Sequence, residues 1–135
     1  MPITIGVEGL TEFNQALKRL DKDLPKLTRL AMNKAADVVV QYGRARIPVR
    51  TGRAQASIKA RSTRGAVRVS EGGNRAPYTP WLDFGGRTGR RKRTVRKFIS
   101  EGRYLYPALY EKSDEIQQAL EDGLRDVAAA AGLEL

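Results

Sequence analysis

The sequence reads Arg44-Ala45-Arg46-Ile47-Pro48-Val49-Arg50-Thr51-Gly52 at the point where a long helical pattern ends and a basic, glycine-rich region begins. Pro48 lacks a backbone N–H and disfavours the helical conformation at Ile47. Gly52 can adopt the left-handed backbone angles that a sharp turn requires. We therefore interpret Pro48, Val49, Thr51 and Gly52 as a hinge motif between a helical part and a β-rich part.

Upstream of the hinge, apolar residues recur at steps of three and four from Leu10 to Tyr42. This spacing predicts a long N-terminal helix over residues 10–45. Pro25 interrupts the pattern without shifting its phase, so we expect either a kink near Pro25 or a break in which Asp23 caps a second helix. The apolar stripe can be the core face, or part of it can pack on a neighbouring subunit. Residues 2–7 alternate weakly and suggest a short edge strand or an arm.

Downstream of the hinge, residues 56–61 and 66–70 read as two strands joined by a turn at Arg64-Gly65, which predicts a small antiparallel sheet. One face of these strands carries Lys59, Arg61 and Arg68. Like charges on neighbouring strands repel unless they are solvated or an anion lies across them.

An aromatic segment follows, with Tyr78, Trp81 and Phe84 close together. We expect a short helix from about Pro77 or Pro80 to Phe84, anchored by Trp81 and Phe84 and stopped by Gly85. The aromatic rings can plug the sheet or offer a stacking surface for bases.

The next twelve residues, 86–97, carry seven cations and no anion. Such a segment has little apolar area to bury, so we expect a mobile loop suited to contact with polyphosphate or an acidic partner. The candidate contact residues are Arg87, Arg90, Arg91, Lys92, Arg93, Arg96 and Lys97. The glycine and lysine spacing of a nucleotide-binding loop is absent from this segment.

The C-terminal region is predicted to form one amphipathic, acidic helix over residues 107–131, with Pro107 in its first turn. Residues 104–135 hold two Lys/Arg against seven Asp/Glu, whereas residues 38–100 hold sixteen against two. The 135 residues fit a single α+β domain, 1–135, in which residues 46–103 form the basic, β-rich part. The charge is therefore strongly bipolar, which favours a polyanion on one side and a different partner on the other.

Several function classes are disfavoured by composition. The chain has no cysteine and no histidine, so it lacks thiolate ligands, the commonest metal ligand and the commonest general base. Glu71 and Asp83 are the only carboxylates among residues 38–100, and no base or cofactor loop accompanies them. We expect no enzyme activity, no metal and no cofactor, and the hydropathy pattern predicts no contact with a membrane.

Three motifs occur together in an order that resembles a known family. They are Ile47-Pro48-Val49-Arg50-Thr51-Gly52, the aromatic segment from Pro77 to Gly85, and Tyr104-Leu105-Tyr106-Pro107-Ala108-Leu109 before a terminal helix. The chain thus resembles the tail-completion, or neck, proteins of long-tailed bacteriophages, a group that includes the minor tail protein Z of phage lambda. The resemblance spans most of residues 10–130.

The resemblance implies a non-enzymatic virion protein, assembled in the host cytoplasm. It would form a homo-oligomeric ring of six at the head-proximal end of the tail, between the tail terminator and the head connector. On this hypothesis the N-terminal helix and the hinge pack subunits side by side, and the basic segment faces DNA in the lumen or an acidic neighbouring ring.

An alternative from another class is a free cytoplasmic nucleic-acid-binding protein, associated with the nucleoid or the ribosome. The high isoelectric point and the arginine-rich segment favour it. The acidic C-terminal helix and the lack of a helix-turn-helix, zinc or aromatic-strand signature oppose it.

Overall fold

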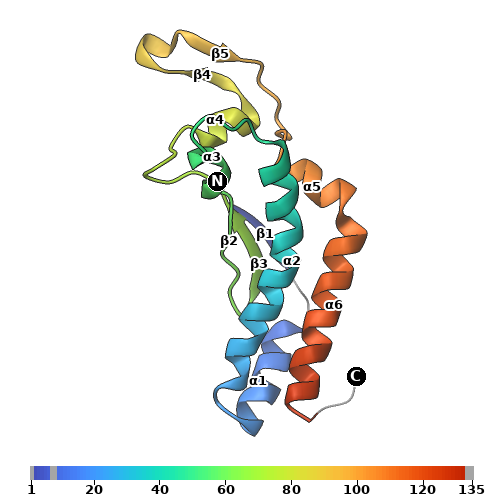
Figure 1. Ribbon diagram of the computed structural model, residues 1–135. Coiled ribbons are helices and arrows are strands. Elements are labelled where there is room, and N and C mark those ends of the chain that lie inside the picture. The colour runs from blue at the N-terminus through green and yellow to red at the C-terminus, as the bar shows by residue number, and fades with distance from the viewer. Residues whose placement is uncertain (1, 7–8, 133–135) are drawn as a thin grey trace.

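The structure is a computed structural model that describes residues 2–6 and 9–132. It is an elongated α+β fold built around one long central helix (Figure 1). In chain order the elements are β1 (Pro2–Gly6), α1 (Leu10–Leu20), α2 (Leu24–Arg46), α3 (Arg53–Ser57), β2 (Lys59–Ala60), β3 (Ala66–Ser70), α4 (Thr79–Phe84), β4 (Gly86–Thr88), the 3-10 turn η1 (Arg90–Lys92), β5 (Thr94–Arg96), α5 (Leu105–Glu111) and α6 (Ser113–Ala130). The predicted fold class is confirmed.

Helix α2 is the centre of the packing. Met32, Ala35 and Val39 on this helix are fully buried, and the sheet and α6 cover it on different sides (Figure 1). Helix α6 passes close to α2 at Gly123, where an added Cβ would lie 2.9 Å from the Cβ of Ala31. The small residues let the two helices pack tightly, so α2 is the layer that holds the sheet and α6 together.

The N-terminal helical pattern forms two helices. Helix α1 ends at Leu20 and α2 begins at Leu24, so the expected break is correct and a single kinked helix is wrong. The Asp21 carboxylate accepts a hydrogen bond from the Asp23 N–H at 2.9 Å, and Pro25 lies in the first turn of α2. Proline is favoured there because the first turn leaves its N–H groups unpaired. The Asp23 side chain makes no cap hydrogen bond and instead pairs with Lys26 at 3.3 Å.

The first sheet has the order β1-β3-β2, and both pairings are antiparallel. Strand β1 pairs along β3 with Ile5 opposite Val67, so the expected edge strand is confirmed. The strand predicted at 56–61 is shorter than expected, because residues 53–57 form α3 after Gly52 turns the chain with φ 82°. The Ser57 hydroxyl donates to the Ala54 carbonyl at 2.6 Å and helps to close this turn of helix.

Residues 86–97 form a β-hairpin rather than the irregular loop that the charge pattern predicted. Strands β4 and β5 pair with Arg87 opposite Val95 and Thr88 opposite Thr94. The prediction considered only apolar burial, whereas cross-strand backbone hydrogen bonds and β-branched residues stabilise this segment. The hairpin lies at the end of the molecule opposite α1 (Figure 1).

The C-terminal region contains two helices, so the expectation of one helix over residues 107–131 is wrong. Lys112 separates α5 from α6 with φ −112° and ψ 18°. Its N–H closes α5 on the Ala108 carbonyl at 2.9 Å. Asp114 and Glu115 then occupy the first turn of α6, where the helix dipole favours negative charge. Pro107 lies in the first turn of α5, so it begins a helix as predicted, but that helix is α5 and not the terminal helix α6.

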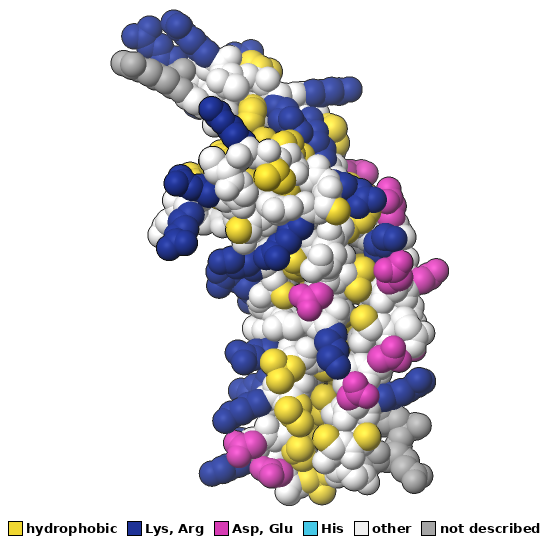
Figure 2. All heavy atoms as spheres, in the orientation of Figure 1, with side chains coloured by type: hydrophobic (Ala, Val, Ile, Leu, Met, Phe, Trp, Pro, Cys, Tyr) yellow, Lys and Arg dark blue, Asp and Glu magenta, His cyan; other side chains and the backbone are white. Residues whose placement is uncertain are grey.

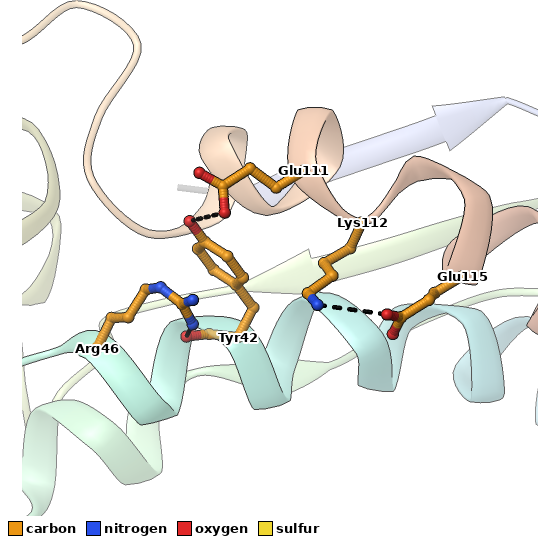
Figure 3. Close-up of polar contacts among 5 residues, drawn as sticks. All are labelled: Tyr42, Arg46, Glu111, Lys112 and Glu115. Atoms are coloured by element: carbon orange, nitrogen blue, oxygen red, sulfur yellow. Dashed lines mark hydrogen bonds and ion pairs between the residues drawn. The ribbon is translucent and has the colours of Figure 1, made fainter.

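A polar contact joins the C-terminal end of α2 to α5 (Figure 3). The Tyr42 hydroxyl donates to a Glu111 carboxylate oxygen at 2.9 Å, and the Arg46 guanidinium lies 3.6 Å from the centre of the Tyr42 ring. Burial, followed by the hydrogen bond to Glu111, raises the pKa of Tyr42. The contact fixes α5 against the central helix.

We expect Tyr42→Phe to lower the free energy of unfolding by about 1 kcal/mol, because it removes this hydrogen bond and leaves the ring in place. Urea denaturation at neutral pH measures the change. Tyr110→Phe is the matched control, since the Tyr110 side chain, on α5 beside Glu111, is 68% exposed. Equal stability of the two variants would contradict the role of the Tyr42–Glu111 contact.

Candidate functional site

The hairpin presents a group of cations to solvent. The exposed side chains are Arg87, Arg91, Lys92, Arg93 and Lys97. No ion pair joins them to any residue in the described ranges 2–6 and 9–132. The Arg90 backbone belongs to η1, and its side chain lies outside what the structure describes. Dark blue side chains accordingly cover the hairpin end in Figure 2.

The hairpin tip has an uncommon backbone conformation. Arg91 and Lys92 have φ values of 58° and 53° between the two strands. Such left-handed angles cost a non-glycine residue about 1 kcal/mol or more. Gly89 precedes them, and its carbonyl accepts the Lys92 N–H at 3.0 Å. Two cations are therefore held at a tight turn, where their side chains are exposed.

Arg96 lies at the base of the hairpin and is only partly exposed. Its Nε donates to the Leu82 carbonyl at 3.0 Å and its Nη2 to the Tyr104 hydroxyl at 3.2 Å. Among the candidate contact residues whose side chains the structure describes, Arg96 is thus the one whose guanidinium attaches the hairpin to α4. Burial raises the pKa of the Tyr104 hydroxyl, so that group stays protonated beside Arg96.

Arg103 is a second anchoring arginine, which the sequence analysis did not single out. Its Nη1 donates to the Asp83 carbonyl at 2.8 Å and its Nη2 to the Lys97 carbonyl at 2.6 Å. A guanidinium can span two acceptors in this way because its donors form a planar fork. Arg103 follows Glu101 in a neutral segment, so charge counting gave no signal for it.

The buried Asp83 side chain accepts hydrogen bonds from the backbone at the base of the hairpin. The side chain is fully buried, and its Oδ1 accepts backbone N–H groups from Arg103 at 2.6 Å and Tyr104 at 2.9 Å. The buried Glu71 carboxyl lies beside it. Burial, then the hydrogen bond with Asp83 and its charge, raises the pKa of Glu71 to about 9. Glu71 is therefore protonated at neutral pH and can donate a hydrogen bond to the Asp83 side chain.

The predicted anchors lie at this same base. The Trp81 indole N–H donates to the Gly86 carbonyl at 3.0 Å, and the Phe84 ring meets Tyr106 edge-on at 6.1 Å. Gly85 ends α4 with φ 84°, and an added Cβ would lie 2.7 Å from the Lys97 carbonyl carbon. The expected helix stop at Gly85 is confirmed, and glycine is required because the returning strand passes so close.

The hinge motif lies beside the aromatic segment. Helix α2 ends at Arg46, and Pro48, Val49 and Thr51 are exposed before Gly52. A groove of about 580 Å³ is lined by hinge residues together with Tyr78 and Leu82. The structure thus brings the hinge and the aromatic segment together, although residues 53–76 separate them in the sequence.

Within the described residues, His, Cys, Asp and Glu side chains form no cluster of three that could hold a metal ion. The helices described here are also too short or too polar to span a bilayer.

One family model matches the chain, over residues 11–85, and it carries the description "Bacteriophage HK97-gp10, putative tail-component". The match covers more than half of the chain and ends just before the hairpin begins. A search of curated proteins and a search of solved structures found no match. The resemblance to phage tail proteins is confirmed, while the particular likeness to the minor tail protein Z stays a prediction. The chain belongs to the HK97-gp10-like family of bacteriophage tail components and is a structural protein of the virion.

Proposed function

We propose that this protein is a ring subunit that completes the head-proximal end of the tail and joins it to the head connector around the DNA channel. Its partners in this role are further copies of itself, the tail terminator or tail tube, and the connector. The observation that carries the proposal is the hairpin at one end of the molecule (Figure 1), whose exposed cations form no ion pair with any residue that the structure describes.

The base of the hairpin supports this role because it is firmly anchored. Arg96, Arg103 and Trp81 each donate to a backbone carbonyl at the junction with α4. An anchored hairpin can hold its cations at a fixed place in an assembly. A ring multiplies each cation by the number of copies, so its lumen would attract DNA through counterion release without reading sequence.

The test replaces Arg87, Arg91, Lys92 and Arg93 by glutamine in the phage genome. We expect a loss of infectious yield of at least about tenfold, with particles that fail to join or that leave DNA open to nuclease, because each phosphate contact contributes to binding. Plaque titre and nuclease protection of packaged DNA measure the effect. Arg96 is left unchanged, so the base of the hairpin stays intact.

A matched control variant replaces four exposed cations at the other end of the molecule with glutamine: Lys18, Arg19, Lys22 and Arg29. This variant should keep normal yield. A normal titre for the hairpin variant would remove the hairpin from the mechanism. Tight binding of duplex DNA by a free monomer, with no virion defect in the hairpin variant, would favour the free nucleic-acid-binding protein instead.

A further inference from the structure

A second basic surface lies away from the hairpin, on the outer face of the first sheet. Lys59, Arg61 and Arg68 lie on or directly beside its strands, and Arg53 on α3 and Arg75 in the loop after β3 extend the surface; we call these five residues the cationic face. Val67 and Val69 on β3 are buried against α2, so Arg68 between them faces solvent, and Lys59 on the neighbouring strand is also exposed. A cleft of about 430 Å³ extends this face, and Arg53, Lys59, Arg61 and Arg75 line part of it.

The arginines of the cationic face are already oriented. The Arg61 Nε donates to the Ser70 hydroxyl at 3.0 Å, and the Arg68 Nε donates to the Thr4 hydroxyl at 3.4 Å. The Arg61 N–H, directly after β2, also donates to the Arg68 carbonyl of β3 at 2.8 Å, so the two like-charged residues lie opposite each other. Within the described part of the chain none of the five cations forms an ion pair. Cations that are fixed close together by hydrogen bonds repel one another, and an anionic surface that binds across them relieves this repulsion.

The complementary surface is on α6. Its exposed side carries Asp114, Glu115, Glu121, Asp122 and Asp126, which we call the acidic face, with Arg125 among them. Two of these carboxylates have exposed ion pairs, Glu115 with Lys112 at 3.3 Å and Asp126 with Lys34 at 3.4 Å. Exposed pairs of this kind contribute little and are readily exchanged. The acidic face therefore keeps a net negative charge, which attracts a cationic surface.

The two faces lie on different sides of the central helix. The sheet and α6 both pack on α2, and Figure 2 shows magenta side chains along α6 and dark blue side chains on the side of β2. One copy therefore cannot bring its own two faces together. A contact between unlike surfaces of successive copies is heterologous, and it builds a closed ring or an open filament.

We infer that the cationic face of one copy binds the acidic face of the next copy, so that the contact repeats head to tail. The occupant is a second copy because each chain carries one surface of each sign, and the head-to-tail contact satisfies both. DNA would satisfy only the cationic face and would be repelled by α6. This inference rests on the proposed function in taking contact between copies as part of the assembly, and it names the surfaces that make that contact.

The test uses two charge-reversed variants of the full chain. One carries Lys59→Glu, Arg61→Glu and Arg68→Glu, so both of its faces are acidic. The other carries Asp114→Lys, Glu121→Lys and Asp122→Lys, so both of its faces are basic. Light scattering and native mass spectrometry at low salt should find oligomers for the unchanged chain and an association at least about 100-fold weaker for each variant alone.

An equimolar mixture of the two variants should restore the oligomers, with the two chains in equal numbers, because acidic and basic copies can alternate. A monomeric unchanged chain, variants that assemble normally, or a mixture that stays monomeric would each overturn the inference. Far-UV circular dichroism checks that each variant is folded, and Lys59→Gln, Arg61→Gln, Arg68→Gln replaces the first variant if it is not.

The hairpin variant described above separates this inference from the proposed function. Replacing Arg87, Arg91, Lys92 and Arg93 by glutamine should leave the oligomers of the purified protein unchanged, because the hairpin is not part of either face. Normal oligomers in a non-infectious hairpin variant support both ideas. Normal oligomers of the charge-reversed variants would reject the contact between the cationic and acidic faces. The role of the hairpin would still be tested by the infectious yield of the hairpin variant.

Discussion

Replacing Asp83 by alanine is expected to lower the free energy of unfolding by at least about 3 kcal/mol, since two buried N–H groups lose their acceptor. These donors are the backbone amides of Arg103 and Tyr104, at 2.6 and 2.9 Å from Oδ1. The loss should also loosen the hairpin, because Arg103 bridges the Asp83 and Lys97 carbonyls. Urea denaturation measures the stability, and hydrogen exchange of the hairpin amides measures the loosening.

Asp83→Asn is the matched control, because its amide oxygen can still accept the two backbone N–H groups, while an NH2 donor replaces the other carboxyl oxygen. It should be clearly more stable than Asp83→Ala. A loss of less than about 1 kcal/mol in the alanine variant would show that the two amides find other acceptors at little cost.

Glu71 should make stability fall as pH rises. Its pKa is about 9 in the folded protein against 4.5 for an ordinary glutamate, so between these values the folded state binds one proton more than the unfolded state. Stability then decreases by up to about 1.4 kcal/mol per pH unit over this window. Glu71→Gln keeps a donor for Asp83 without an ionisable proton, so we expect it to be more stable than the unchanged protein near pH 8 by up to about 5 kcal/mol.

Thermal melts between pH 4 and pH 9 test this expectation. The two proteins should have similar stability near pH 4, where Glu71 is protonated in both the folded and the unfolded state. Glu115→Gln, a change at an exposed glutamate on α6, should follow the unchanged protein across the whole range. Curves for Glu71→Gln and the unchanged protein that stay parallel up to pH 9 would mean that Glu71 is not held in its protonated form.

Local patterns were enough to predict several elements. The apolar spacing located α2, alternation located β3 at its observed bounds, and the proline, aromatic and glycine signals located α4 and its stop at Gly85. Each of these sequence signals determines the backbone conformation only within a few residues of its own position. The turn of helix at residues 53–57 was missed because Gly52 redirects the chain before the β-branched pattern begins.

The features that sequence could not reveal depend on residues that are distant in the chain. The pairing of Glu71 with Asp83, and of Asp83 with the amide of Arg103, requires the end of β3, α4 and the segment before α5 to meet. The hairpin cations were all singled out by charge, but charge alone could not distinguish the anchoring Arg96 from the exposed Arg93. Their roles in contact with DNA or a neighbouring ring stay predictions.

The order of the sheet has a consequence for how the chain folds during synthesis. Strand β1 pairs with β3, so Ile3 has no partner until Val69 has left the ribosome. Helices α1 and α2 form from contacts close in sequence and can appear earlier. The side of α2 that packs on α6 stays exposed longest during synthesis, because α6 is the last of the described helices to be made. The nascent chain therefore carries an exposed apolar stripe through most of its synthesis, and the C-terminal helix is the element that ends that period.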